Sequence, residues 1–134
     1  MDPIVFLIAQ FLTPFSRGLD VVPFEGPARA YPVEHAVGVY LIMFRDGILT
    51  VTMVFRSSPI RTAGDYLHDI EKALAFPVPL DDKTQMEFVF QKNLYEGYDR
   101  GMNADFHSAT FRIKSAEALP ELMDDMDIME AEAE

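Results

Sequence analysis

Residues 36–56, AVGVYLIMFRDGILTVTMVFR, decide the fold of this chain. The segment 36–44 is apolar on both sides of an extended chain, which is typical of a buried strand. Arg45-Asp46-Gly47 is a turn signal, because glycine readily adopts the positive φ of a tight hairpin. Residues 48–56 then alternate, with one side apolar and the other polar: Leu49, Val51, Met53 and Phe55 against Thr50, Thr52 and Arg56. The stretch predicts an antiparallel hairpin whose second strand is half-buried.

An amphipathic helix is predicted immediately after this hairpin. Thr62 is suited to cap its start, with Asp65 three residues later as the acidic partner of a capping box. One side carries apolar residues at helical spacing, namely Ala63, Tyr66, Leu67, Ile70, Ala73 and Leu74. Pro77 and Pro79 end the helix, and the charged residues between 65 and 72 occupy the opposite side.

A second hairpin is predicted from two further alternating segments. In the first, Met86, Phe88 and Phe90 alternate with polar residues, and in the second Ala109, Phe111 and Ile113 do so. The stretch 92–104 between them, KNLYEGYDRGMNA, is interpreted as a long loop rich in Tyr. Connections of this length are often functional.

The N-terminal segment predicts a very hydrophobic helix. Asp2 and Pro3 are typical of a helix start, and the helix is expected to run to Leu12 and to stop before Pro14. Its apolar residues lie on almost every side, so one core face cannot bury them all. Either a partner covers the rest, which we favour, or the helix lies between two layers. Residues 17–32 contain too many Pro and Gly for a periodic element and predict an extended loop.

The expected fold is therefore α+β. It consists of a mainly antiparallel sheet of about four strands, with the N-terminal helix and the amphipathic helix packed on it. The predicted order is helix-strand-strand-helix-strand-strand within a single domain, residues 1–116. Residues 117–134 form an acidic tail with Leu and Met at helical spacing, which can become helical on binding a neighbour.

Charge is distributed unevenly along the 134 residues. The net charge is −11, yet residues 117–134 hold eight acidic and no basic residues, whereas residues 1–116 hold 14 acidic and 11 basic ones. Binding to nucleic acid phosphates depends on clustered Lys and Arg, so the composition disfavours it. An acidic tail indicates instead a basic protein partner or a solubilising role.

No pattern of catalytic or metal-binding residues stands out. The chain has no Cys, which excludes disulfides and thiolate chemistry, and its three His residues are far apart. No Ser lies in a nucleophile elbow, and no glycine-rich phosphate loop follows a strand. We therefore expect a protein that is not an enzyme, with no catalytic residue, no metal and no cofactor. The apolar N-terminus is too short to span a membrane and lacks the positive start of a secretory signal, so we expect synthesis in the cytoplasm and no membrane partner.

The residues expected to contact a partner come from three segments. Tyr and Arg are enriched at protein interfaces, which favours such a role for Tyr95, Tyr98 and Arg100, although these Tyr residues can also simply cover the edge of the core. Surplus apolar surface on the first helix and adaptable Met residues in the tail complete the set. The predicted interface residues are Ile4, Phe6, Phe11, Tyr95, Tyr98, Arg100, Met123 and Met126.

Several segments taken together resemble the tail terminator (tail completion, or minor capsid-like) proteins of long-tailed bacteriophages. They are PFEGPARAYP at 23–32, FRSS at 55–58, AGDYLHDIEKALAF at 63–76, EFVFQKN at 87–93, GYDRG at 97–101 and FHSATFRIKS at 106–115. The family commonly has a G-x-D-x-x-G-like turn in the last hairpin, and Gly97, Asp99 and Gly101 give a version one residue shorter. The resemblance covers residues 1–115 and rests mainly on the order and size of the elements.

The resemblance implies a structural virion protein of the tail or neck, made in the host cytoplasm. Such proteins form a ring, usually a homohexamer, which ends polymerisation of the tail tube and joins the tail to the head-side connector. The implied partners are other copies of the chain, the tail tube protein and the connector protein, with DNA only passing through the lumen. Two alternatives remain open: an acidic DNA mimic that inhibits a host nuclease or restriction factor, and a small protein-binding adaptor domain.

Overall fold

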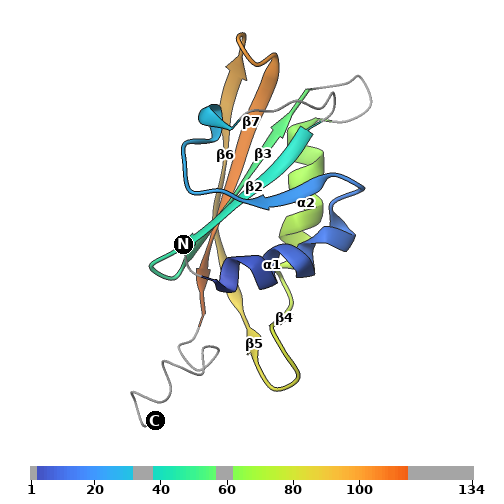
Figure 1. Ribbon diagram of the computed structural model, residues 1–134, viewed down its shortest axis with the longest axis vertical. Coiled ribbons are helices and arrows are strands. Elements are labelled where there is room, and N and C mark those ends of the chain that lie inside the picture. The colour runs from blue at the N-terminus through green and yellow to red at the C-terminus, as the bar shows by residue number, and fades with distance from the viewer. Residues whose placement is uncertain (1–2, 32–37, 57–61, 115–134) are drawn as a thin grey trace.

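The computed structural model describes residues 3–31, 38–56 and 62–114. They form an α+β fold with a five-stranded mixed sheet and two α-helices. Figure 1 shows α1 and α2 on the same side of the twisted sheet. The elements in chain order are α1 (Ile4–Leu12), the 3₁₀ turn η1 (Thr13–Phe15), β1 (Asp20–Pro23), the 3₁₀ turn η2 (Ala28–Ala30), β2 (Gly38–Arg45), β3 (Ile48–Phe55), α2 (Ala63–Ala73), β4 (Val78–Pro79), β5 (Gln85–Met86), β6 (Phe88–Asp99) and β7 (Ala104–Ile113).

The central hairpin is confirmed. β2 and β3 pair antiparallel from Gly38↔Phe55 to Arg45↔Ile48. Asp46 and Gly47 have φ of 55° and 77°, as a tight two-residue turn requires. Residues 36 and 37, which the sequence placed in the first strand, lie outside the described residues.

The predicted loop at residues 92–104 is wrong. β6 continues to Asp99 and pairs with β7 down to Asp99↔Ala104, so only residues 100–103 form the turn. Gln91 and Glu96 are bulges with no partner in β7, and each bulge shifts the alternation of side chains by one residue. Because of these shifts, residues 88–99 do not show the continuous apolar–polar alternation by which a strand is recognised in a sequence. The second hairpin itself is confirmed.

The predicted extended loop at residues 17–32 contains a strand that the sequence did not indicate. β1 pairs parallel with β2 from Asp20↔Val39 to Pro23↔Ile42, giving the sheet order β1-β2-β3-β7-β6. An edge strand of four residues can end in Pro23, because its outward side needs no further hydrogen-bond donor. The sheet therefore has five strands and one parallel pair, in place of about four antiparallel strands. β4 and β5 form a separate two-stranded ribbon.

Both helices follow the sequence closely. α1 ends at Leu12 before Pro14, and it buries Val5, Ile8, Ala9 and Leu12. Asp2, its expected cap, lies outside the described residues. In α2 the capping box is confirmed: the Thr62 side chain accepts from the Asp65 amide, and the Asp65 carboxylate accepts from the Thr62 amide at 2.9 Å. The buried side of α2 is the predicted one, including Ala63, Leu67, Ile70 and Ala73.

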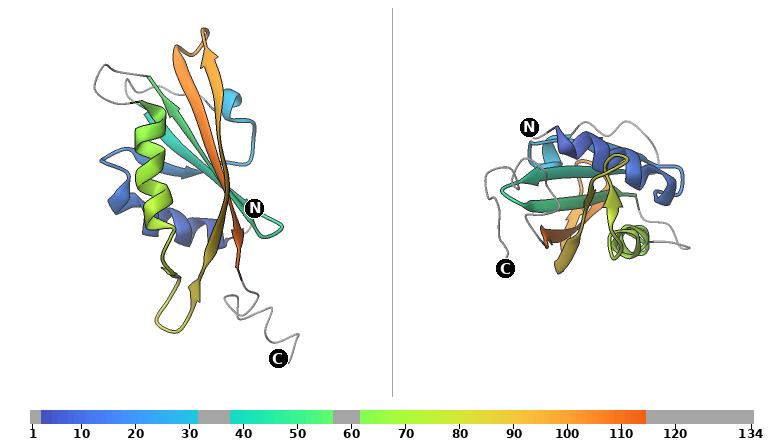
Figure 2. Two further views of the ribbon diagram at one scale, coloured as in Figure 1. Left: turned by 180° about the vertical axis from the view of Figure 1, so that it is seen from behind. Right: turned by 90° about the horizontal axis from the view of Figure 1, so that it is seen from below.

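The sheet has two unequal faces. Its helical face, covered by α1 and α2, carries the main core, which includes Tyr40, Val51, Met53 and Phe111. On its back face, Phe24, Ala28, Tyr31 and Met102 cover only the half that contains Val39, Val54 and Phe106. Figure 2 shows both helices on one side of the sheet and η2 on the other. The other half of the back face, toward the β2–β3 turn, has no helix over it among the described residues.

Candidate protein-interaction surfaces

The outer side of α1 exposes large apolar residues. Phe6 is 54% exposed and Leu7 is 39% exposed, although both lie in the middle of the helix. Ile4 and Phe11, predicted beside Phe6, are half-buried and pack against the core. Of the three interface residues predicted in this helix, Phe6 is therefore the one whose side chain chiefly faces outward.

A groove lies between the end of α1 and the end of α2. It has a volume of about 670 Å³ and includes Phe11, Phe15 and Phe76 among its lining residues. The rings of Phe11 and Phe15 are 5.5 Å apart, and Phe76 is 69% exposed. Arg17 and Asp69 form an ion pair in the wall of the groove. The groove therefore extends the apolar surface of α1 toward α2.

A second exposed apolar surface lies on the edge strand β6. Phe90, Tyr95 and Tyr98 are 49%, 55% and 52% exposed. They lie opposite Phe111, His107 and Asp105 of β7, so they share the helical face of the sheet. We call Phe90, Tyr95 and Tyr98 the β6 aromatic row. β6 is the last strand of the sheet, at the end opposite β1.

Hydrogen bonds hold the two tyrosines of the β6 aromatic row in place. The Tyr95 hydroxyl donates to Asp105 Oδ1 at 2.6 Å, and the Tyr98 hydroxyl donates to Asn103 Oδ1. The bond to Asp105, together with burial and the charge of that carboxylate, raises the pKa of Tyr95 above its ordinary value. Ordered aromatic side chains lose little rotamer freedom on binding, which suits them to an interface.

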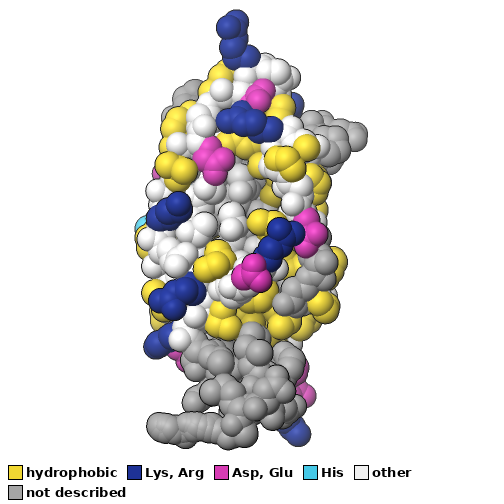
Figure 3. All heavy atoms as spheres, turned by 90° about the vertical axis from the view of Figure 1, so that its left-hand side faces the viewer, with side chains coloured by type: hydrophobic (Ala, Val, Ile, Leu, Met, Phe, Trp, Pro, Cys, Tyr) yellow, Lys and Arg dark blue, Asp and Glu magenta, His cyan; other side chains and the backbone are white. Residues whose placement is uncertain are grey.

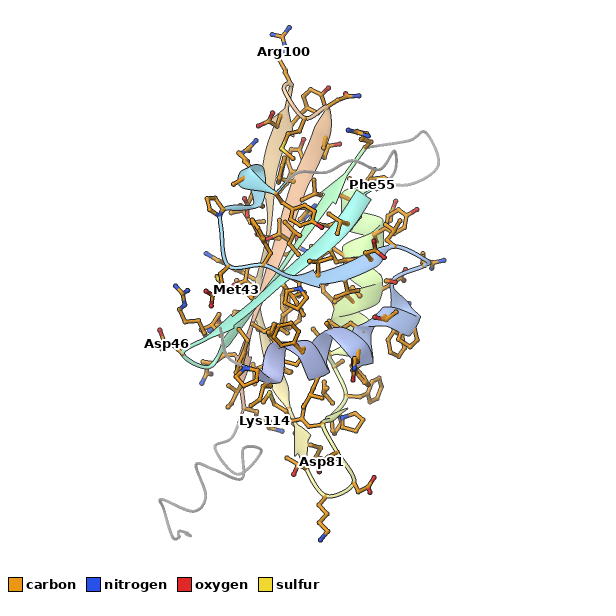
Figure 4. All side chains as sticks on the ribbon, in the orientation of Figure 1. Met43, Asp46, Phe55, Asp81, Arg100 and Lys114 are labelled. Carbon is orange, nitrogen blue, oxygen red and sulfur yellow. The ribbon has the colours of Figure 1, made fainter. Side chains whose placement is uncertain are left out.

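Arg100 lies at the tip of the β6–β7 turn and projects away from the body of the protein (Figure 4). The preceding residue, Asp99, organises this turn. Its carboxylate accepts from the Met102 amide at 3.0 Å and pairs with Arg29 at 2.8 Å. These contacts lower the pKa of Asp99, the Met102 amide being the largest cause and Arg29 the next. The Arg29 guanidinium also lies 4.5 Å from the centre of the Phe106 ring, which ties η2 to the back face of the sheet.

A polar chain connects α2 to the strands beside it. The Asn93 amide donates to Glu71 at 2.5 Å, and the Asn93 oxygen contacts His107 Nε2. Glu71 also lies 3.8 Å from His68 on the same helix. His68 is thus engaged by Glu71, and His107 by Asn93 and by the ring of Tyr95. Within residues 3–31, 38–56 and 62–114 no group of three or more His, Cys, Asp or Glu side chains converges as metal ligands would. None of the helices in the described ranges is both long and apolar enough to cross a membrane.

Several exposed residues of the α1 surface with its groove, and of the β6 aromatic row, were not predicted from the sequence. Leu7, Phe15, Phe76 and Phe90 are exposed, yet none of them was among the predicted interface residues. Only the strand order reveals that β6 lies at the edge of the sheet, so local alternation could not identify Phe90. The predicted tail contacts Met123 and Met126 lie outside the described residues. In comparisons with known proteins, no family model matches the chain and no curated protein matches it significantly.

Proposed function

We propose that this chain is a structural protein that assembles with copies of itself into a ring. In line with its resemblance to tail terminator proteins, the ring would end polymerisation of a tail tube and offer a surface to a head-side connector. The proposed partners are the chain itself, the tube protein and the connector protein. The proposed location is the tail or neck of a virion.

One observation carries this proposal: two different apolar surfaces are exposed at two ends of the same sheet. α1 packs over the β1–β2 end and exposes Phe6 and Leu7, whereas the β6 aromatic row lies at the opposite end. An exposed apolar patch commonly marks a site of protein contact. Two such patches at opposite ends of the sheet suit a chain that contacts one copy with each of them.

The difference between the two surfaces favours a ring over a simple dimer. A two-fold dimer joins the same patch of both subunits, whereas contact between unlike patches propagates from copy to copy until it closes. Each contact can be weak, since closure makes every subunit bound twice. The exposed Phe6 and Leu7 of α1 in one copy would thus contact the β6 aromatic row of the next copy.

Complementation between two variants tests this arrangement. Phe6→Asp removes the α1 surface and Tyr98→Asp removes the β6 surface, and both side chains are exposed, so the fold should tolerate either change. Native mass spectrometry should find a ring for the unaltered chain and a monomer for each variant alone. An equal mixture should give a heterodimer, because each variant retains the surface that the other lacks.

Other outcomes would contradict the proposal. If either variant alone forms a stable dimer, the surviving patch binds itself and the contacts are not of the ring type. If the unaltered chain remains a monomer even beside purified tail tubes, both the ring and the terminator role fail. A control variant, Lys83→Glu on the exposed turn between β4 and β5, should leave assembly unchanged.

A further inference from the structure

The half of the back face over which no described helix lies is a mixed basic and apolar surface. Strand pairing places its residues in rows that cross β2, β3, β7 and β6. The first row is Arg45–Ile48–Arg112–Val89, and the second is Met43–Thr50–Thr110–Lys92. The third row, Leu41–Thr52–Ser108–Leu94, borders the covered half, because its first three residues are buried and only Leu94 is exposed. We call these three rows the open sheet face. Figure 3 views the molecule from the side of η2 and shows Lys and Arg side chains spread among hydrophobic and neutral ones, with a few Asp and Glu side chains between them.

The open sheet face is rich in positive charge. Its rows contain Arg45, Arg112 and Lys92, all exposed, and no acidic residue. Arg45 has a long contact of 3.6 Å with Glu25, whereas no ion pair between described residues engages Arg112 or Lys92. The net charge of the chain is −11, so this local concentration of positive charge is unusual, and it would attract an anionic group.

The same rows expose apolar side chains between these charges. Val89 and Leu94 are 39% and 50% exposed, and Ile48 and Met43 are half-buried. Met43, labelled in Figure 4, lies on the side of the sheet away from α1 and α2. A ligand for this surface therefore needs an apolar stripe flanked by negative charge.

The chain itself supplies such a ligand. Residues 117–134 contain eight acidic and no basic residues, and their Leu119, Leu122, Met123, Met126 and Met129 recur at helical spacing. An amphipathic helix of this kind buries its apolar stripe against a matching surface. β7, which carries Arg112 and Thr110, leads directly into this segment through Lys114. Eighteen helical residues would extend about 27 Å, enough to lie along the sheet.

We propose that the acidic segment 117–134 packs as a helix on the open sheet face of its own chain, with carboxylates paired to Arg112, Lys92 and Arg45. The groove between α1 and α2 is less suitable, because its cations Arg17 and Lys72 stand beside Asp69 and the acidic outer side of α2. The proposal concerns a different face of the sheet from the proposed ring contacts, so either can fail without the other.

Zero-length cross-linking of the full-length protein tests this contact. A carbodiimide joins a Lys amine directly to a carboxylate with loss of water, so only groups in contact react. The chain has four Lys residues: Lys114 next to the segment, Lys92 on the open sheet face, Lys72 on α2 and Lys83 in the β4–β5 turn. Peptide mass spectrometry should find Lys92 joined to residues within 117–134, with at least tenfold lower yield at Lys72 and Lys83.

Two matched variants and an isotope mixture sharpen the result. Arg112→Glu reverses one charge on the open sheet face and should reduce the Lys92 product several-fold, whereas Lys83→Glu should not. In a mixture of light and ¹⁵N-labelled protein, the product should join peptides of the same label. Products of mixed label would show that the segment reaches a neighbouring copy, which overturns the proposal. A dominant product at Lys72, or no product at Lys92, would overturn it as well.

Discussion

Individual residues of α1 divide sharply between core and surface. Ile8 is fully buried, whereas Phe6 two residues earlier is 54% exposed. Burial of an aliphatic side chain stabilises a fold through apolar transfer and close packing, and truncation also leaves a cavity. The two positions therefore separate stability from assembly within a single turn of helix.

Ile8→Ala should lower the free energy of unfolding by about 2–5 kcal/mol. Phe6→Ala should lower it by much less, because half of the ring already contacts water, but it should weaken self-association. Urea unfolding and sedimentation at several protein concentrations measure the two effects. Equal destabilisation by both variants would show that Phe6 belongs to the core of the monomer.

Asp99 links the stability of the β6–β7 turn to pH. The Met102 amide and Arg29 lower its pKa in the folded protein below the ordinary value of about 3.9. The stabilisation is therefore fully present above that ordinary value and is lost as the pH falls through the lowered pKa. Asp99→Asn should reduce Tm at pH 6, and the difference from the unaltered protein should shrink between pH 4 and pH 2. Arg29→Gln removes one of the two causes of the lowered pKa, so in that background Asp99→Asn should reduce Tm by less. A Tm difference that stays constant with pH would refute this role of Asp99.

Among the elements, α2 depends on a local signal at its first turn. Thr62→Ala removes the hydroxyl that accepts from the Asp65 amide, and it should cost about 1 kcal/mol of stability. Thr62→Ser keeps the acceptor and should cost much less. Urea denaturation compares the two, and an equal loss for both would mean that the methyl group of Thr62 matters more than the cap.

The elements show where prediction from sequence succeeds. The β2–β3 hairpin, α1 and α2 follow from turn residues, caps and periodicity, all of which act within a few residues. β1 was missed because four residues at a sheet edge carry no period of their own and gain their structure from β2. β6 was cut short because its bulges at Gln91 and Glu96 interrupt the alternation.

The candidate surfaces were only partly predictable for a related reason. Surplus apolar content in α1 predicted outward-facing Ile4, Phe6 and Phe11, of which Phe6 is exposed whereas the other two pack against the core. The residue types of the 95–101 segment indicated exposed Tyr and Arg. Which side of a strand is exposed depends on its place in the sheet, and that place is set by partners distant in sequence. The charged rows of the open sheet face likewise exist only once four strands are aligned.

The whole molecule combines two kinds of proposed contact, which should respond differently to salt. Apolar contact between subunits is not weakened by added NaCl, whereas pairing of exposed charges is screened, with a Debye length of about 3 Å at 1 M. Raising NaCl from 50 mM to 1 M should leave the sedimentation of the assembly unchanged and suppress the Lys92 cross-link. Loss of the assembly at high salt would show that charge, and not apolar surface, holds the copies together.

The position of β7 also bears on how a ribosome-bound chain acquires this structure. β7 is the last strand of the described chain, yet it lies between β3 and β6 and pairs with both. A nascent chain that lacks residues 104–113 cannot join its two hairpins, and β3 then presents an unpaired apolar edge. Strand edges of this kind invite association during synthesis. Assembly of the five-stranded sheet must therefore wait until residues 104–113 have been synthesised.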